Sequence, residues 1–199
     1  TIPFWANKNL WFDIGDKKSL REKYSLNFDS FYVGSFQRDT EGHDLKSPKL
    51  SKGPDQFIEI VKTLKEDKKN LEVLLTGKRR QYLINELNKN NIPYKYFEMT
   101  NFTDLNELYN CLDLYIVTSR YEGGPQSIFE CALTKTPIIS TNVGVAPEIL
   151  NPDSLFEMPN YHLAKPDIEF AYRKAQNFII PKGFEPFNKM FNEVVNEVI

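Results

Sequence analysis

The sequence predicts an α/β protein in which helices cover both faces of a parallel sheet of five or six strands. Two observations carry this prediction. From about residue 30 to residue 160, apolar runs rich in β-branched and aromatic residues alternate strictly with amphipathic segments of helical period. The apolar runs have no polar face, which is typical of strands that are covered on both sides. Crossovers between such strands are right-handed, and a Rossmann-like strand order, 3-2-1-4-5-6, is the expected arrangement.

The individual elements follow from this alternation. Strands are expected at residues 31–35, 72–77, 94–99, 114–119 and 137–141, with a last short strand at 154–158. Helices are expected at residues 54–67, 81–91, 104–112, 125–134 and 146–150, and the tail segments 161–179 and 184–199 are both expected to be helices. Pro54 suits the first turn of its helix, because a missing N–H costs nothing there. Asp104 is the expected cap of the helix at 104–112.

Composition argues against several classes of protein. The chain has 199 residues, with 25 Lys and Arg against 27 Asp and Glu, and a formal net charge of -2. A general nucleic-acid-binding protein would have a strongly basic face. Cys111 and Cys131 stand in apolar helical surroundings, which indicates buried thiols rather than a disulfide or a metal site. No apolar run approaches the ~20 residues that a membrane span needs, so a cytosolic setting is expected.

The expected strand order locates a binding site. In the order 3-2-1-4-5-6 the first and fourth strands are neighbours at the point where the winding reverses. Ligands of open α/β sheets bind beyond the carboxyl ends of those two strands. The segments that follow strands 31–35 and 114–119 are therefore the candidates.

The segment after the fourth strand, RYEGGPQSIFE (120–130), has the features of an anion site. Pro125 suits the first position of a helix, which leaves the N–H groups of Gln126 and Ser127 free. Free N–H groups and the helix dipole together favour a phosphate. Gly123 and Gly124 allow a ligand to approach the backbone closely.

Two carboxylates flank this predicted anion site. Glu122 lies at the strand end, and Glu130 lies a turn and a half into the helix, where it can face the same crevice. Carboxylates in such positions accept hydrogen bonds from sugar hydroxyls, so a sugar on one side of a phosphate and a ribose on the other are expected. The alternative is that Glu122 is an ordinary loop acid and Glu130 a partly buried structural acid.

The long segment after the first strand, residues 35–53, is also a candidate, because loops of this length are usually functional or disordered. It carries cations up to the start of a helix at Pro54, and a second basic run follows the strand at 72–77. Cations before a helix N-terminus oppose the dipole unless an anion is bound. Each alone is best interpreted as a surface charge, but together they favour a phosphate site: Arg38, Lys46, Lys49 and Lys52, then Lys78, Arg79 and Arg80.

Together these motifs resemble a known family. The segments FYVGSFQRD, KLSKGPDQFIEIVKTL, LEVLLTGK and DLNELYNCLDLYIVTSRYEGGPQSIFECALTKTPIISTNVGVAPEIL are similar to the C-terminal half of a GT-B glycosyltransferase. The resemblance is greatest to family four of the retaining enzymes, the glycosyl transferases group 1. It extends from about residue 30 to residue 150 and implies the donor-binding, C-terminal domain of a GT-B fold.

The resemblance implies roles for the matching residues. Lys52 would bind the donor diphosphate, Glu122 the donor sugar and Glu130 the ribose hydroxyls. The family has an arginine directly after the glycine of its first strand, where this chain has Ser35, and Arg38 is the expected substitute. Thr100 and Asn101 would lie where such enzymes read the base, and Pro125 replaces a common glycine. The expected catalytic residues are Glu122, Lys52 and Arg38, and the expected donor-binding residues are Gly34, Ser35, Gly123, Gly124, Gln126, Ser127, Glu130, Thr100 and Asn101.

The function implied is transfer of a sugar, with retention, from a nucleotide diphosphate sugar linked to UDP, GDP or ADP. No metal or other cofactor is expected, because fixed cations and a helix N-terminus can stabilise the departing diphosphate. The implied partner is an N-terminal acceptor-binding domain, without which the fragment is expected to be inactive and through which it could contact a membrane. Nucleic acid is not an expected partner.

Three regions are expected along the chain. Residues 1–28 form an interdomain linker, rich in aromatic residues, with a leading helix; residues 29–182 form the Rossmann-like nucleotide-sugar-binding domain. Residues 183–199 form a helix whose apolar stripe packs either on its own domain or on the missing N-terminal domain. The stripe consists of Phe184, Phe187, Phe191, Val194, Val195 and Val198.

Two other interpretations remain. The chain is a non-catalytic Rossmann-like module for nucleotide binding or assembly, which an uncovered apolar patch would favour. Otherwise it is an epimerase or a phosphorylase on the same fold. The sequence has neither the extra acids or histidines of the former nor a recognisable pyridoxal-binding lysine of the latter.

Overall fold

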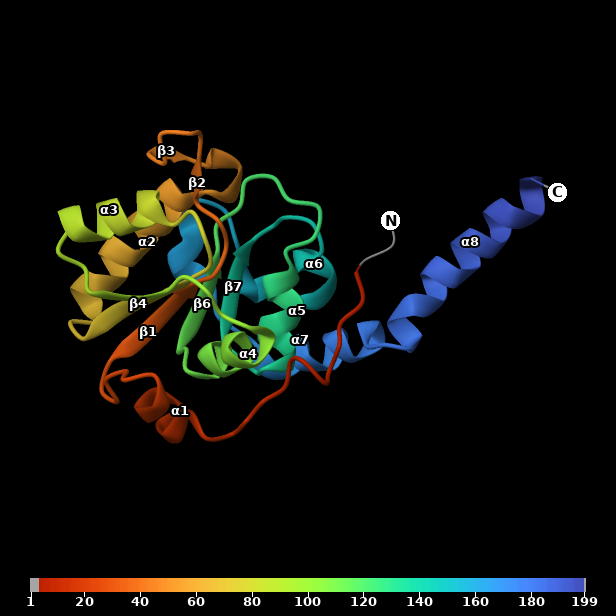
Figure 1. The fold of residues 1–199 in the computed structure, drawn as a ribbon, viewed down its shortest axis with the longest axis horizontal. Helices are drawn as coiled ribbons and strands as arrows, with labels where there is room; N and C mark the ends of the chain where they lie inside the picture. Colours follow the sequence, from red (N-terminus) through yellow and green to blue (C-terminus); the bar gives the residue numbers. More distant parts are fainter. Residues whose placement is uncertain (1–3, 199) are drawn as a thin grey trace.

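The computed structural model describes residues 4–198 and has at its centre a sheet of six parallel strands (Figure 1). The strands are β1 (Phe31–Ser35), β4 (Leu71–Thr76), β5 (Tyr94–Phe97), β6 (Leu114–Val117), β7 (Ile138–Thr141) and β8 (Leu155–Phe156). Their order across the sheet is β5-β4-β1-β6-β7-β8, and every neighbouring pair is parallel. Numbered along the chain within this sheet, the order is 3-2-1-4-5-6, so the expected Rossmann-like arrangement is confirmed.

Helices cover both faces of this sheet (Figure 1). They are α1 (Lys17–Lys23), α2 (Pro54–Asp67), α3 (Gln81–Lys89), α4 (Phe102–Asn110), α5 (Gln126–Leu133), α6 (Ala146–Ile149), α7 (Ile168–Ala175) and α8 (Glu185–Val198). The short 3₁₀ turns are η1 (Leu50–Lys52), η2 (Pro152–Ser154), η3 (Asn160–Leu163), η4 (Gln176–Phe178) and η5 (Lys182–Phe184). No helix within residues 4–198 combines the length and the apolar character needed to cross a bilayer.

The core has two halves, one on each face of the sheet, because side chains alternate along each strand. Val33 of β1 belongs to the cluster that contains the apolar residues of α2 and α3. The preceding residue, Tyr32, belongs to the cluster that contains those of α4, α5 and α7. The prediction of strands covered on both sides is confirmed. Cys111 and Cys131 are free and buried, as expected.

Four helix starts differ from the expected ones. Helix α7 begins at Ile168 rather than at residue 161, because Pro166 disfavours a helical conformation before it, and α8 begins one residue late, at Glu185. Helix α4 begins at Phe102 rather than Asp104, and its cap is Asn101, whose side-chain oxygen accepts from the N–H of Asp104 at 2.8 Å. Helix α5 begins at Gln126, and Pro125 is its N-cap with an extended ψ of 112°. The prediction of Asp104 as the cap of α4 was therefore wrong by three positions, and the prediction of Pro125 as the first residue of α5 was wrong by one.

The segment between β1 and α2 is partly ordered by a hairpin. Strands β2 (Thr40–Glu41) and β3 (Ser47–Pro48) pair antiparallel, and η1 follows directly. Beneath the hairpin, Arg80 Nε lies 2.7 Å from Asp39 Oδ2, with both side chains almost fully buried. Arg80 also donates from Nη2 to Ser35 Oγ at 3.2 Å. The prediction of Arg80 as a phosphate-binding cation is therefore wrong, because its guanidinium is enclosed and used internally.

The N-terminal segment of the described chain lies against the segment that leads into α8. The N–H of Ala6 donates to the Phe178 carbonyl at 2.8 Å, and the N–H of Ile180 donates to the Ala6 carbonyl at 3.0 Å. The Trp5 ring lies edge-on, at 5.0 Å, to the rings of both Phe184 and Phe187.

Helix α8 then extends away from the rest of the molecule (Figure 1). Phe191, Val194 and Val195 of its apolar stripe are more than half exposed. The alternative in which the apolar stripe packs on its own domain is therefore wrong for Phe191, Val194 and Val195. The expected regions also included residues 1–3 and 199 and the side chain of Val198, which lie outside the described part.

Candidate functional site

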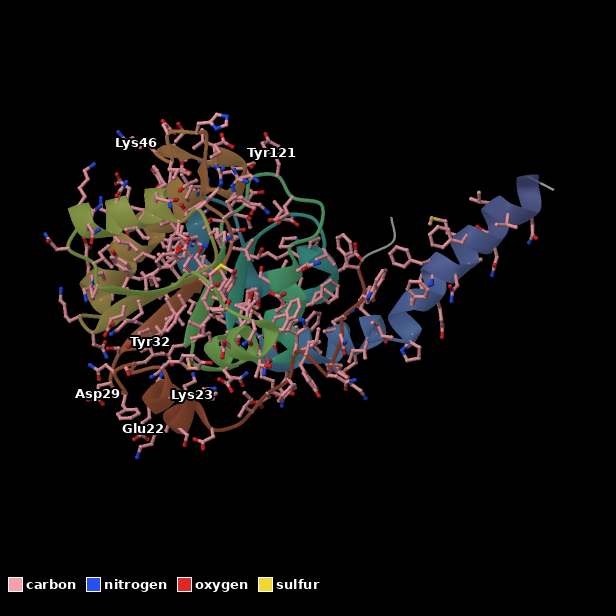
Figure 2. All side chains as sticks on the ribbon, in the orientation of Figure 1. Glu22, Lys23, Asp29, Tyr32, Lys46 and Tyr121 are labelled. Carbon is pink, nitrogen blue, oxygen red and sulfur yellow. The ribbon has the colours of Figure 1, made fainter. Side chains whose placement is uncertain are left out.

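The parallel sheet has one edge at which its strands begin and one at which they end, and the candidate site lies at the edge where they end. In Figure 2, Lys46 labels the β2–β3 hairpin and Tyr121 labels the loop between β6 and α5. Both lie at the end where β1 and β6 terminate. Glu22, Lys23 and Asp29 label the opposite end, around α1. Loops at the carboxyl ends of β1 and β6 are those expected to bind a ligand.

A pocket of about 440 Å³ opens beside these strand ends. Its residues come from five places. They are the N-terminal segment before α1, called the leader here, the loop after β1, helix α4, strand β6, and the loop before α5 with the first turns of that helix. The lining residues are Phe4, Phe36, Gln37, Leu105, Tyr109, Tyr115, Glu122, Gly124, Pro125, Gln126, Ser127 and Glu130. Pockets of 300–1,000 Å³ with a few converging polar groups are typical of small-molecule sites.

The N-terminus of α5 forms one wall of the pocket. Counting from the start of α5, the first backbone N–H group that has an acceptor is that of Ile128, which donates to the Pro125 carbonyl at 3.1 Å. Within residues 4–198, no acceptor receives the N–H groups of Gln126 and Ser127. A Cβ on Gly124 would lie 3.2 Å from the Phe4 ring, so this glycine lets the leader approach the loop closely. Free amides at a helix N-terminus form an anion site.

A cation and a carboxylate meet beside this wall. Lys52 Nζ forms an ion pair with Glu122 Oε1, and the two side chains are only 20% and 16% exposed. Ser119 Oγ donates to the other carboxylate oxygen, Glu122 Oε2, at 2.7 Å. The Lys52 carbonyl accepts from Gln37 Nε2 at 3.1 Å and from Thr118 Oγ1 at 3.2 Å. The backbone of Lys52 is therefore held by residues that follow β1 and β6, the two strands where the winding of the sheet reverses.

Helix α2, unlike α5, has a carboxylate of its own at its N-terminus. Asp55 Oδ2 lies 2.6 Å from Arg120 Nη2, and this hydrogen bond lowers the pKa of Asp55. Arg120 also donates from Nη1 to the Leu50 carbonyl at 3.0 Å. The conflict between Lys52 and the α2 dipole is thus relieved by Glu122 and Asp55, and the N-terminus of α5 is left as the candidate anion site of this end.

Glu130 faces the same pocket from the second turn of α5. Tyr109 Oη donates to Glu130 Oε2 at 2.6 Å. Burial raises the pKa of Glu130 to about 7, and the bond from Tyr109 opposes that rise. Tyr115 Oη, which also lines the pocket, accepts from the N–H of Phe36 at 3.0 Å. Among the described residues, no group of three or more His, Cys, Asp or Glu is arranged to hold a metal ion.

The structure gathers only part of the predicted set around the pocket. Glu122, Gly124, Gln126, Ser127 and Glu130 line it, and Lys52 joins it through the contact with Glu122. Gly123 lies in the same loop, with open space where a Cβ would stand. The remaining predicted residues do not line the pocket: Gly34, Ser35, Arg38, Thr100 and Asn101.

Each of these five has another environment. A Cβ on Gly34 would meet Leu112 at 2.3 Å, so that glycine is required by packing. Ser35 is buried beside Arg80, and Arg38 is exposed and donates to the Thr40 carbonyl at 2.9 Å. Asn101 caps α4, and Thr100 precedes it.

Sequence reasoning missed half of the pocket wall. Gln37 lines the pocket, whereas its neighbour Arg38 is exposed and does not. The other missed residues are Phe4, Phe36, Leu105, Tyr109 and Tyr115. Only Tyr115 carries an available signal, a polar atom within the run LYIV (114–117) that is otherwise apolar.

Comparisons with known proteins bear on the family and the fold. A family model described as glycosyl transferases group 1 matches residues 47–177. A search of curated protein sequences finds no significant match.

Solved structures share the fold at low sequence identity. Sucrose-phosphate synthase (tll1590) from Thermosynechococcus elongatus is 16% identical with a TM-score of 0.73, over 99% of this chain and 52% of that chain. Anabaena Alr3699/HepE, solved with UDP and glucose, is 18% identical with a TM-score of 0.67, over 96% and 55%. The C-terminal domain of LpcC, a glycosyl transferase group 1 protein from Francisella tularensis, is 17% identical with a TM-score of 0.61, over 86% and 93%. The chain thus spans about half the length of the first two structures and nearly all of the isolated C-terminal domain.

Proposed function

The chain belongs to the glycosyl transferases group 1 family, and from this premise we propose that it binds a nucleotide diphosphate sugar in the pocket beside α5. Its fold is that of a C-terminal GT-B domain. The observation that carries the proposal is the convergence of the uncapped α5 N-terminus, the Lys52–Glu122 pair and Glu130 on one pocket.

In the proposed complex the diphosphate lies at the amides of Gln126 and Ser127. Lys52 is close enough to share its charge between Glu122 and the diphosphate, since it already reaches the Glu122 carboxylate. During transfer, the bond between the sugar anomeric carbon and the diphosphate oxygen breaks, and negative charge grows on the leaving diphosphate. Amides and an ammonium group held in position stabilise that charge without reorganising. We propose that this arrangement needs no metal ion.

The two carboxylates have separate roles in this proposal. Glu122 accepts hydrogen bonds from the donor sugar, while Glu130 accepts them from the ribose. Retention of configuration, and membership of family four of the retaining enzymes, are proposed from the family resemblance alone. No residue of the pocket is assigned as a covalent nucleophile. A cytosolic setting also remains a proposal.

UDP is the first nucleotide to test, because the Anabaena protein of similar fold was solved with UDP and glucose. GDP and ADP are the alternatives. We expect well-folded protein to bind one of the three in isothermal titration calorimetry. Loss of binding to all three would refute the proposed function. Glu130→Ala should weaken the nucleotide, and Glu122→Ala should weaken the intact donor more than the bare nucleotide.

We also propose that the acceptor is bound by a second domain. The chain spans about half of the similar solved structures, and α8 carries exposed Phe191, Val194 and Val195. These side chains would dock on that domain, and the present chain alone would transfer little sugar. Efficient turnover by this chain alone would contradict the proposal.

The same exposed stripe favours a second candidate, a non-catalytic assembly module that uses the fold without its chemistry. Nucleotide binding separates the two candidates. A folded protein that binds no nucleotide and associates through α8 would support the module.

A further inference from the structure

Tyr109 is one of the two tyrosines that are buried in the wall of the pocket. It is 1% exposed, and its ring centroid lies 4.7 Å from Phe36, 5.4 Å from Tyr115 and 5.9 Å from Trp11. Such packing leaves the ring one orientation. A buried hydroxyl is costly unless it is hydrogen-bonded. The hydroxyl of Tyr109 meets this need by donating to Glu130 Oε2 at 2.6 Å.

Glu130 depends on this bond, because its surroundings offer it no cation. The titratable groups that face it are Tyr109 from α4, Tyr115 from β6 and Cys131 from its own helix. Glu122 lines the same pocket and is already paired with Lys52. None of the ion pairs within residues 4–198 includes Glu130.

The leader adds no charge. Glu130 also lines a second hollow, of about 210 Å³, whose other walls are uncharged. Those walls are Phe4, Trp5, Ala6, Asn7, Leu10, Trp11, Phe102, Gln126 and Phe129. Within the described residues, the Tyr109 hydroxyl is therefore the one hydrogen-bond donor to the Glu130 carboxylate.

We propose that Tyr109 is a positioning residue for nucleotide binding: its hydroxyl fixes the Glu130 carboxylate as the acceptor for the ribose hydroxyls. This inference rests on the proposed function, in which Glu130 contacts the ribose. A carboxylate accepts from both ribose hydroxyls, whereas a protonated acid has lost part of that capacity. Tyr109 stabilises the ionised form, so it sets the pH range in which the ribose is held.

The consequence is a pH profile that a purely structural tyrosine would not produce. Burial holds the pKa of Glu130 at about 7, so nucleotide affinity should rise with pH through neutrality. Tyr109→Phe removes a hydrogen bond to a charged group and should move that rise upward by about one pH unit. At pH 7 the variant should bind about fivefold more weakly than wild type, and at pH 9 the two should converge.

The test is calorimetry from pH 6 to pH 9 with two probes, UDP and 2′,3′-dideoxyuridine diphosphate. If UDP gives no heat, GDP or ADP and the matching dideoxy compound replace it. The proteins are wild type, Tyr109→Phe, Glu130→Gln and a matched control, Tyr24→Phe. Tyr24 also donates from its hydroxyl to a carboxylate, that of Asp104 at 3.0 Å, but it lies outside the pocket.

The expected pattern has four parts. Wild type and Tyr24→Phe bind the ribonucleotide with the same rise through about pH 7. Tyr109→Phe shows the rise displaced to higher pH. Glu130→Gln binds weakly and shows only the rise near pH ~6 that comes from ionisation of the terminal phosphate of the ligand. The dideoxy probe shows that same rise and no rise through pH ~7 with any of the proteins, because it has no ribose hydroxyl to offer.

The failures of the inference and of the proposed function are distinguishable. If Glu130→Gln weakens the ribonucleotide but Tyr109→Phe keeps the wild-type profile, the inference alone is overturned. It is overturned as well if Tyr109→Phe weakens both probes equally at every pH, which is the result of a structural role. If Glu130→Gln binds like wild type, or if no nucleotide binds, the proposed function falls and the inference with it. If Tyr109→Phe does not fold, fluorotyrosine at position 109 should move the rise to lower pH, and an unmoved rise overturns the inference.

Discussion

Replacing Glu130 with glutamine should stabilise the folded protein at alkaline pH while it weakens nucleotide binding. The pKa of Glu130 rises from 4.5 to about 7 on folding, chiefly because of burial. A raised carboxyl pKa adds stability that is complete below pH 4.5 and is lost as pH rises through 7. A shift of this size corresponds to about 3 kcal/mol, and the open pocket reduces it to about 1–3 kcal/mol. Glutamine avoids this cost and keeps an oxygen for the Tyr109 hydroxyl.

Urea unfolding at pH 5 and pH 8 measures the effect. We expect Glu130→Gln to match wild type near pH 5 and to be more stable by about 1–3 kcal/mol at pH 8. For a chain of this size, each kcal/mol raises the melting temperature by about 2–4 °C. Glu122→Gln is the matched control, and it should destabilise the protein at both pH values because it breaks the pair with Lys52. A Glu130→Gln variant that is less stable than wild type at pH 8 would refute the reasoning.

Three further changes test other parts of the site and the buried ion pair beneath the β2–β3 hairpin. Lys52→Met should weaken UDP but not uridine in calorimetry, and should cost about 1–3 kcal/mol in urea unfolding, between the values for exposed and buried pairs. Equal losses for the two ligands would contradict a phosphate role. Gly53→Ala should destabilise the protein and weaken UDP, because a Cβ there would lie 1.8 Å from the Thr118 carbonyl oxygen and φ is +60°; an unchanged melting temperature would count against it. Arg80→Met should cost about 3–5 kcal/mol by leaving a buried aspartate unpaired, and a near-neutral change in urea unfolding would show that the pair is not structural.

The sheet was predictable because its signal is local. Each strand is marked by a continuous apolar run and most helices by a period of 3.6 residues within their own segments, and helix α2 has the bounds that Pro54 and the apolar spacing indicated. The strand order then follows from the few topologies that parallel sheets adopt. The cap of α4 was misplaced because Asn101 and Asp104 are both good capping residues, and only the backbone geometry decides between them.

The site was predictable only where function is carried by one segment. The residues 122–130 form a loop and a helix start, so their proximity follows from the chain itself. Arg80 and Tyr109 were misread or missed because their partners are far away in sequence: Ser35 lies 45 positions from Arg80, and Glu130 lies 21 positions from Tyr109. Charge in a sequence does not tell whether a cation will meet solvent, a ligand or a buried aspartate.

The contact between the leader and the tail couples two distant parts of the molecule mechanically. Trp5 rests on Phe184 and Phe187, while the residue before it, Phe4, lines the pocket. A swing of α8 that keeps these ring contacts pulls on Phe4 through a single peptide unit. Such a swing would displace the part of the pocket wall that Phe4 forms, and a shift of Phe4 would in turn tilt the helix.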